Sequence, residues 1–291
     1  MTTYRLIILL IATLLAGCAL QPPTKKPNAT ILDNTSGQWV TPQTLPEKLA
    51  KADYVIVGEL HNSHKMRDDL INTLKTLRHN NQLDALVIDA LKPRSEPTTH
   101  SYLEQLNSAH SALADHFRPI VIWAEQNNVT LIGAATPKEQ FNNLKTPEGQ
   151  HWLKQQTKGA LTADKEKELT QILENVHPTA KMPPSKSSFM LSAQQLHDYL
   201  SARTLASAGD QSVLITRAFH ARKDLGVSPY LHKLKPGVSI VTLLMIEPMN
   251  GEDVSQEDIN SMKKQYDYIW VQKNEPNLLI APVDQNKPME N

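Results

Sequence analysis

The feature that most constrains the fold is a series of short, continuous apolar runs separated by segments of helical periodicity. The runs are rich in β-branched residues and do not alternate with polar ones, which is typical of strands buried on both faces. Between them apolar residues recur every three or four positions, as at Met66, Leu70 and Leu74. This alternation predicts an α/β fold, a mostly parallel sheet flanked by helices. The expected strands are 54–57, 85–88, 129–134, 213–216, 238–245 and 268–271.

One stretch, roughly residues 137–208, contains no convincing strand. Helix-start signals occur at Thr136, which is followed by proline and later by glutamate, and at Ser192, with glutamine three residues on. Because the strand-helix alternation resumes afterwards, we expect an all-helical insertion that forms a cap over one end of the sheet. The alternative is that these helices cover one of its faces.

The charge balance and the cysteine count exclude several classes of function. The 291 residues contain 30 basic and 30 acidic side chains, so there is no strong positive field for nucleic acid, and we exclude nucleic acid as a partner. Cys18 is the single cysteine, which excludes disulfide frameworks, thiolate zinc clusters and covalent haem attachment through a CxxCH motif. Any metal or cofactor must therefore be held by other side chains or by the backbone.

The amino-terminal residues resemble the export signal of a bacterial lipoprotein. Arg5 precedes an apolar run of about ten residues, which is shorter than the ~20 that a membrane-spanning helix needs. Residues 15–18, LAGC, resemble a lipobox, in which cleavage precedes the cysteine and its sulfur receives a lipid. Ala19, in place of aspartate, favours the outer membrane by the same resemblance. The alternative is an ordinary secretion signal with an incidental Cys18.

We therefore expect three regions and a lipid-anchored protein that faces the periplasm. The proline-containing segment after the cysteine is typical of an extended tether. The regions are a signal peptide over 1–17, a lipidated cysteine with a flexible tether over 18–40, and an α/β domain with its helical cap over 41–291.

Residues able to bind metal or move protons follow three of the predicted strands. In parallel α/β sheets the ligand site lies beyond the carboxyl ends of the strands, so these side chains are expected to meet at one edge. Polar residues are also common there simply because the chain emerges into water, which is the competing interpretation. The candidates are Glu59, His61, His64, Asp89, Arg217 and His220.

The spacing of these candidates indicates two kinds of chemistry. Glu59 and His61 are two residues apart and point to the same side of an extended chain, whereas His64 joins them only if the next helix starts early. Imidazole nitrogens with carboxylate oxygens suit a divalent metal such as Mn, Co or Zn, or a general acid/base pair. The metal set would be Glu59, His61, Asp89 and His220.

Other residues are assigned by their place in the predicted elements. The sequence has no Walker loop, no GxGxxG after a strand and no GxSxG elbow. Tyr199, His197 and His177 belong to the helical insertion and would supply an axial ligand if the cap overhangs the strand ends. Five histidines are expected on helix surfaces or in loops, namely His79, His100, His110, His116 and His232.

Taken together these residues resemble the ChaN family of iron-regulated, haem-binding lipoproteins. The resemblance lies in residues 58–61 (GELH) followed by His64, in the carboxylate after the second strand, and in His220 followed by residues 226–229 (GVSP) and Leu231. The resemblance extends over about residues 54–234. The family belongs to a superfamily with the Tiki-type metal-dependent proteases and the erythromycin esterases.

Two residues depart from the family pattern. Asp89-Ala90 stands where glutamate followed by methionine is common, and Phe219 replaces the glycine usual before the second histidine. The larger ring of Phe219 is expected to narrow the pocket.

The resemblance implies a pocket at the strand ends, haem as the cofactor, and a role in haem or iron acquisition. Arg217 and Arg222 are placed to pair with haem propionates. The expected partners are the membrane through the lipid anchor, haem and a haem or iron transport system, and the residues leave a homodimer open. A metal-dependent hydrolase is the alternative function, and a purely structural descendant is a third. A non-enzymatic haem-binding protein is the leading hypothesis.

Overall fold

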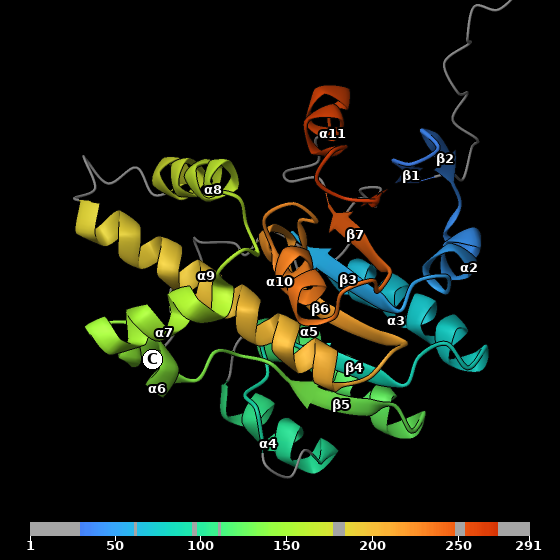
Figure 1. Cartoon of the computed structure of the whole chain (residues 1–291). Coiled ribbons are helices and arrows are strands. Elements are labelled where there is room, and N and C mark those ends of the chain that lie inside the picture. Colours follow the sequence, from blue (N-terminus) through green and yellow to red (C-terminus); the bar gives the residue numbers. More distant parts are fainter. Residues whose placement is uncertain are drawn as a thin grey trace, which may run out of the picture.

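Eight strands form one sheet in the computed structural model of the chain, which describes residues 30–60, 63–94, 98–109, 112–176, 184–247 and 254–272. The strand order is β2-β1-β8-β7-β3-β6-β4-β5, and most of the sheet crosses the centre of Figure 1. The strands are β1 (Ile31–Asp33), β2 (Gln38–Val40), β3 (Tyr54–Glu59), β4 (Ala85–Ile88), β5 (Thr130–Gly133), β6 (Ser212–Arg217), β7 (Ile240–Ile246) and β8 (Tyr268–Val271).

The six strands predicted from the apolar runs are all present, and they pair in parallel with one another. The prediction of an α/β fold with a mostly parallel sheet is confirmed. At one edge β1 pairs antiparallel with both β2 and β8. β1 and β2 fall within the flexible tether expected over 18–40. The expected end of the tether at residue 40 is therefore wrong, because the folded domain already includes Ile31. β1 and β2 have three residues each, which is too few to produce a recognisable pattern in the sequence.

Helices cover both faces of the sheet. On one face Val55 and Val57 pack with residues of α2, α3, α4 and α5, and on the other Tyr54 and Ile56 pack with residues of α7, α8, α9 and α10. Alternate residues of β3 are thus buried on opposite sides. The helices are η1 (Pro42–Thr44), α2 (Leu45–Leu49), α3 (His64–His79), α4 (Thr99–Ala109), α5 (Ala112–Gln126), α6 (Lys138–Asn143), α7 (Pro147–Thr157), α8 (Ala163–Val176), α9 (Pro184–Ser207), η2 (Ala218–Ala221), α10 (Val227–Leu234) and α11 (Gln256–Met262).

The segment between β5 and β6 contains α6, α7, α8 and α9, and its described residues include no strand. In Figure 1, α9 is the long yellow to orange helix that passes beside α10. Its carboxyl-terminal half packs on the sheet, since Leu200 and Leu205 belong to the same core as Ile56 and Leu214. The insertion therefore covers a sheet face, and the middle of α9 also reaches the strand ends, as described below.

Of the two expected helix starts in this segment, the first lies within two residues of the start of α6, although its expected side-chain cap is absent, and the second is wrong. Residue Pro137 occupies the cap of α6 and no side chain caps that helix, because the Thr136 hydroxyl lies against His197. Ser192 lies inside α9 and its hydroxyl donates to the carbonyl oxygen of Ser188, at 3.0 Å. A serine or threonine four residues from a carbonyl can bond within the helix instead of starting one.

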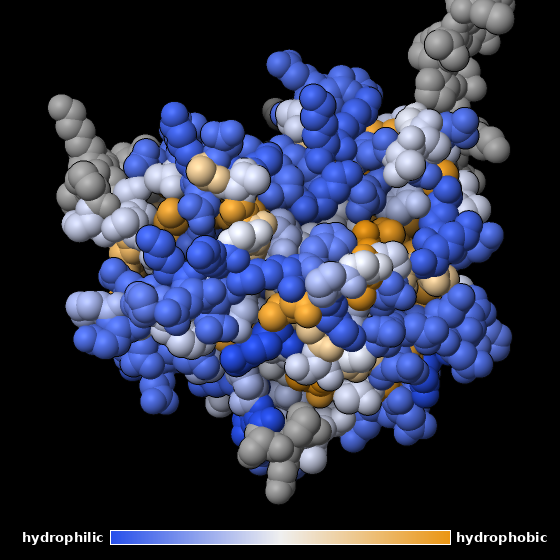
Figure 2. Space-filling model, in the orientation of Figure 1, coloured by the Kyte–Doolittle hydropathy of each residue, from blue (hydrophilic) through white to orange (hydrophobic). Residues whose placement is uncertain are grey.

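The surface in Figure 2 is predominantly hydrophilic, with hydrophobic residues in small, separated areas. No helix within the described ranges is both long enough and apolar enough to cross a bilayer. The part of the fold that bears most directly on function is the carboxyl edge of the sheet, where polar side chains such as Glu59 and Asp89 are buried.

Candidate functional site

A cavity of about 720 Å³ opens at the carboxyl ends of β3, β4 and β6. Its size is within the range of small-molecule sites, about 300 to 1,000 Å³. We call it the cleft. Both apolar and ionisable side chains line it, from strand ends, from α5 and α9, and from η2. They are Glu59, Leu60, Asp89, Ala90, Phe117, His197, Thr216, Arg217, Ala218, Phe219 and His220.

The structure brings together Glu59, Asp89, Arg217 and His220, four residues that the strand-end argument selected. In the sheet register Glu59 is directly opposite Arg217. Because these strands are parallel and aligned, their ends deliver the side chains to one place. His61, His177 and Cys18 lie outside the described residues.

Glu59 is buried and has a partner that the sequence analysis did not identify. His116 Nε2 lies 3.1 and 3.0 Å from the two Glu59 carboxylate oxygens, and both side chains are almost fully buried. Since the carboxylate only accepts, Nε2 donates. The prediction of His116 as a surface residue is wrong, because α5 turns this side chain toward the sheet, against the ring of Phe117.

Asp89 and His197 form a second carboxylate-histidine pair. His197 Nε2 lies 3.2 Å from Asp89 Oδ2, which also accepts from the Thr216 hydroxyl, while His197 Nδ1 lies 3.2 Å from the Thr136 hydroxyl. Burial opposes both charges, but the hydrogen bond and the mutual attraction prevail. The pKa of Asp89 is lowered and the pKa of His197 is raised, so the pair favours its ionised form.

His220 and Asp198 form a third pair. Asp198 is fully buried, and its Oδ1 accepts from His220 Nδ1 at 2.7 Å. The Gln194 amide donates to the other carboxylate oxygen at 2.9 Å, and its nitrogen is 2.8 Å from the same His220 Nδ1. The His220 ring lies against that of His197, with 4.0 Å between their centroids. Thus two histidines, each held by a carboxylate, meet at the cleft.

Two glycines allow η2 to bring His220 to this place. A Cβ on Gly58 would lie 2.6 Å from the Cβ of Ala221 and 2.9 Å from the Cα of Ala218, so only glycine lets η2 pack on β3. A Cβ on Gly226 would lie 2.0 Å from the His220 carbonyl oxygen. Gly58 lies within the regular strand β3 and does not form a sharp turn. Its lack of a side chain allows η2 to approach the strand closely.

His64 and Tyr199 are not among the residues that line the cleft. His64 is the exposed first residue of α3, which Ser63 caps by accepting from the backbone N–H of Met66 at 3.0 Å. The Tyr199 hydroxyl donates to Gln156 at 2.8 Å, and its ring packs on Trp152. Tyr199 thus joins α9 to α7, with its hydroxyl already bonded.

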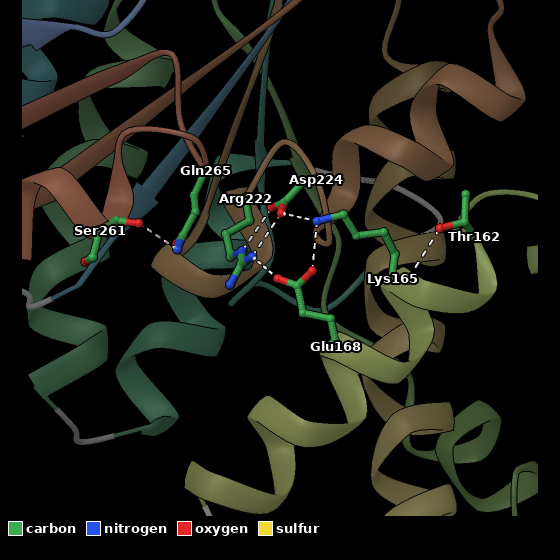
Figure 3. Close-up of polar contacts among 7 residues, drawn as sticks. All are labelled: Thr162, Lys165, Glu168, Arg222, Asp224, Ser261 and Gln265. Carbon is green, nitrogen blue, oxygen red and sulfur yellow. Dashed lines mark hydrogen bonds and ion pairs between the residues drawn. The ribbon is translucent and has the colours of Figure 1, made fainter.

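The two arginines expected to bind propionates have different surroundings. Arg217 is exposed where it lines the cleft, and it forms no ion pair with a described residue. Arg222 is buried and paired with Glu168 at 3.1 Å and Asp224 at 3.0 Å, and Lys165 bridges the same two carboxylates (Figure 3). The prediction for Arg222 is wrong, because its guanidinium is already neutralised.

This ion-pair network borders a second cavity of about 520 Å³, to which Arg222 and Glu168 contribute. Leu60, Ala218 and Phe219 line both cavities, so they form the wall between them. Phe219 is one of the two departures from the family pattern. The Arg222 guanidinium lies over its ring, with 5.6 Å between the guanidinium carbon and the ring centroid.

No group of three or more histidine, cysteine or acidic side chains in the described residues is arranged to hold a metal ion. Glu59, Asp89 and Asp198 each have at least one carboxylate oxygen bonded to a histidine instead. The metal-dependent hydrolase hypothesis therefore gains no support from this part of the chain.

Sequence reasoning missed three residues at this site, which are His116, Asp198 and Gln194. All three are on helices rather than strand ends. Gln194, His197 and Asp198 follow a spacing of three and four, which places them on one helix face, and this was the available signal. For His116 the sequence offered no comparable indication.

Fold and site together define an α/β protein with a pocket at the carboxyl edge of its sheet that two histidines line. Residues 45–231, more than half of the chain, match the family described as haem-binding uptake, Tiki superfamily, ChaN. The chain belongs to this family.

The fold recurs in a solved structure. That of ChaN of Campylobacter jejuni, described as showing cofacial haem binding, has a TM-score of 0.61 and 16% identity, over 85% of this chain and 98% of the other. The type III effector HopBA1 gives a TM-score of 0.42 and 13% identity, over 80% and 94%. No curated protein matches the sequence.

Proposed function

We propose that the protein binds haem in the cleft. The observation that carries this proposal is the coexistence, in one cavity, of apolar walls, a histidine and an arginine without an ion pair. Phe117, Phe219 and Leu60 provide apolar surface, His220 provides a nitrogen, and Arg217 provides a positive charge. Haem has a flat apolar ring, an iron centre and propionate carboxylates, so it needs apolar walls, a ligand atom and a positive charge.

The donor chemistry of the cleft fits haem in a further respect. Three carboxylates lie near the cavity, and each forms a hydrogen bond with a histidine. Arg217 has no such partner among the described residues, so it is available to bind a propionate. When bound, haem would supply iron for coordination, while the chain supplies the walls, the charge and the ligand.

A titration with haemin tests this proposal. The full chain in detergent should show a saturable change in the Soret band, and Arg217→Gln should weaken binding about tenfold, or about 1.4 kcal/mol. The matched control is Arg203→Gln, which removes an exposed arginine of α9 that does not line the cleft. A change that never saturates, or equal losses in both variants, would contradict haem binding in the cleft.

The proposal extends to location and partners. A lipid on Cys18 would hold the protein at the outer membrane, facing the periplasm, where it would serve haem or iron acquisition together with a transport system. A second copy of the chain is a further proposed partner. The Cys18→Ser variant should lose lipid labelling and appear in the soluble fraction, and its retention in the membrane would show that another segment anchors it.

A further inference from the structure

The second cavity takes no part in the haem binding proposed above. It is lined by one face of α8, by the end of α11 with the residues that follow it, by η2 and by β7. On α8 the lining residues Glu168, Gln171 and Asn175 are spaced by three and four, which places them on one face of the helix. The volume of about 520 Å³ is within the range of small-molecule sites, about 300 to 1,000 Å³.

Arg222 supplies a buried hydrogen-bond donor to this cavity. The residue is 6% exposed, its Nε donates to Asp224 at 3.0 Å, and its Nη2 donates to Asp224 at 3.0 Å and to Glu168 at 3.1 Å. No described residue bonds to Nη1, as Figure 3 also shows for the network. A guanidinium has five N–H donors, so Nη1 is left to donate to a ligand.

The charges around Arg222 cancel, which favours a neutral ligand. Arg222 and Lys165 carry two positive charges, and Glu168 and Asp224 carry two negative ones. All four carboxylate oxygens are bonded to one of the two basic side chains. An anion would therefore meet no net positive charge, and a cation would find no free carboxylate oxygen.

Three carboxamides add both donors and acceptors to the cavity. Gln171 and Asn175 are exposed on α8, and Gln265, after α11, donates from Nε2 to the Ser261 carbonyl oxygen at 3.2 Å. Each carboxamide has an oxygen that accepts and an NH₂ group that donates. A hydroxyl group also does both, so a ligand with several hydroxyl groups would match these side chains.

Apolar surface lies beside these polar groups. The rings of Phe219 and Tyr266 and the side chain of Leu244 line the same cavity. The Tyr266 hydroxyl donates to the Ala218 carbonyl oxygen at 2.8 Å, so its polar end is already bonded. A sugar ring carries hydroxyl groups at its rim and C–H groups on its faces, and an aromatic ring gives such a face a wide apolar surface.

An extended peptide is a poorer match to this cavity. Peptides that bind to a sheet add a strand to a free edge. Strand β7, which contributes Leu244 to the cavity, is paired with β3 on one side and with β8 on the other. No edge of β7 is therefore free for the main chain of a peptide.

From these contacts we infer that the second cavity is a binding site for a neutral saccharide. Arg222 Nη1 and the carboxamides of Gln171, Asn175 and Gln265 bond to its hydroxyl groups, and the ring of Phe219 packs against its apolar face. This site is separate from the haem site of the proposed function and does not depend on it.

The first experiment titrates the full chain with sugars in a detergent that has no sugar head group. The probes are glucose, galactose, N-acetylglucosamine, maltose and cellobiose, followed by saturation-transfer NMR. At least one of them should bind saturably, and glucosamine and glucuronate should bind more weakly than glucose. Failure of all five neutral sugars to saturate would overturn the inference, and so would tighter binding of a charged sugar or of a neutral tetrapeptide.

The second experiment locates the sugar. Gln171→Ala and Gln265→Ala should each weaken its binding about threefold to tenfold, as expected for the loss of one hydrogen bond. The matched control is Gln155→Ala, which removes an exposed glutamine of α7 that lines neither cavity and should not change the affinity. An equal loss in Arg217→Gln, whose side chain lines only the cleft, would place the sugar in the cleft and overturn the inference.

Arg222 is tested in the unmodified protein and in one variant. The NMR signals of its guanidinium should shift as the sugar saturates the protein, and unchanged signals would contradict its role as a donor. Arg222→Lys keeps the charge but lacks Nη1, so it should bind the sugar about tenfold more weakly. Circular dichroism shows whether this variant is folded, and the glutamine variants test the site whether it folds or not.

Discussion

The two ends of the same parallel strands use their polar residues in different ways. At the amino ends the Tyr54 hydroxyl donates to Asp210 at 3.0 Å, and Lys235 contacts both groups. There Asp53 accepts from the backbone N–H and the hydroxyl of Ser239 at 2.7 and 2.8 Å. These bonds join the start of β3 and the residue before it to segments that precede β6 and β7, and the groups line neither of the cavities described above.

At the carboxyl ends the polar residues occur as three carboxylate-histidine pairs next to a cavity. His220 and Arg217 both line the cleft, and Arg217 forms no ion pair with a described residue. The comparison shows that the polar groups at the amino ends join segments of the chain to one another, whereas those at the carboxyl ends are gathered beside a cavity. The pairs are Glu59 with His116, Asp89 with His197, and Asp198 with His220.

The largest effect on stability is expected at the Glu59–His116 pair. His116→Phe keeps a ring in the same place but leaves the Glu59 carboxylate buried without its donor, which should lower the free energy of unfolding by about 3 to 5 kcal/mol. Urea denaturation measures this. The double variant Glu59→Met with His116→Phe should recover much of the loss, because no charge remains buried. Equal losses in the single and double variants would contradict the pairing.

A smaller effect is expected at the amino ends. Tyr54→Phe removes one buried hydroxyl and leaves Asp210 and Lys235 paired with each other, so the unfolding free energy should fall by about 1 kcal/mol. The affinity for haemin should not change, because this residue is at the opposite end of β3 from the cleft. A loss of haemin binding in this variant would remove the distinction between the two ends.

The smallest effect is a pH dependence at the ion-pair network of Figure 3. Burial alone would raise the pKa of Asp224, but its bonds to Arg222 and Lys165 hold it below the ordinary value of 3.8. A lowered folded pKa means that the stabilisation is complete above about pH 5 and is lost as the pH falls through 3.8 and then through the folded value.

Asp224→Asn tests this dependence. Because the carboxylate is partly exposed and screened, the variant should lose less than about 1 kcal/mol at pH 7. The difference from the unmodified protein should shrink between about pH 5 and pH 3, as thermal unfolding at several pH values would show. A difference that stays constant over this range would show that the charge of Asp224 does not stabilise the fold.

The sequence was sufficient for the elements whose pattern is local. The continuous apolar runs identified β3 to β8, and the rule for parallel strand ends selected Glu59, Asp89, Arg217 and His220. It was not sufficient for β1 and β2, because three residues do not establish a period.

The residues of α5 and α9 at the site were missed for a different reason. The direction of His116 and Asp198 depends on how a helix packs against strands that are distant in the sequence. The status of Arg222 likewise depended on its pairing with Glu168, 54 residues away. Tertiary packing decided each of these cases, although the helical spacing of Gln194, His197 and Asp198 gave a local indication for Asp198.

Locating the iron tests the central claim most directly. A crystal of the haem complex, measured at the iron absorption edge, should give one anomalous peak per chain in the cleft, at the edge of the sheet where β3 and β4 end. A peak in the second cavity, beyond Phe219, or at the amino ends near Tyr54 would contradict the account.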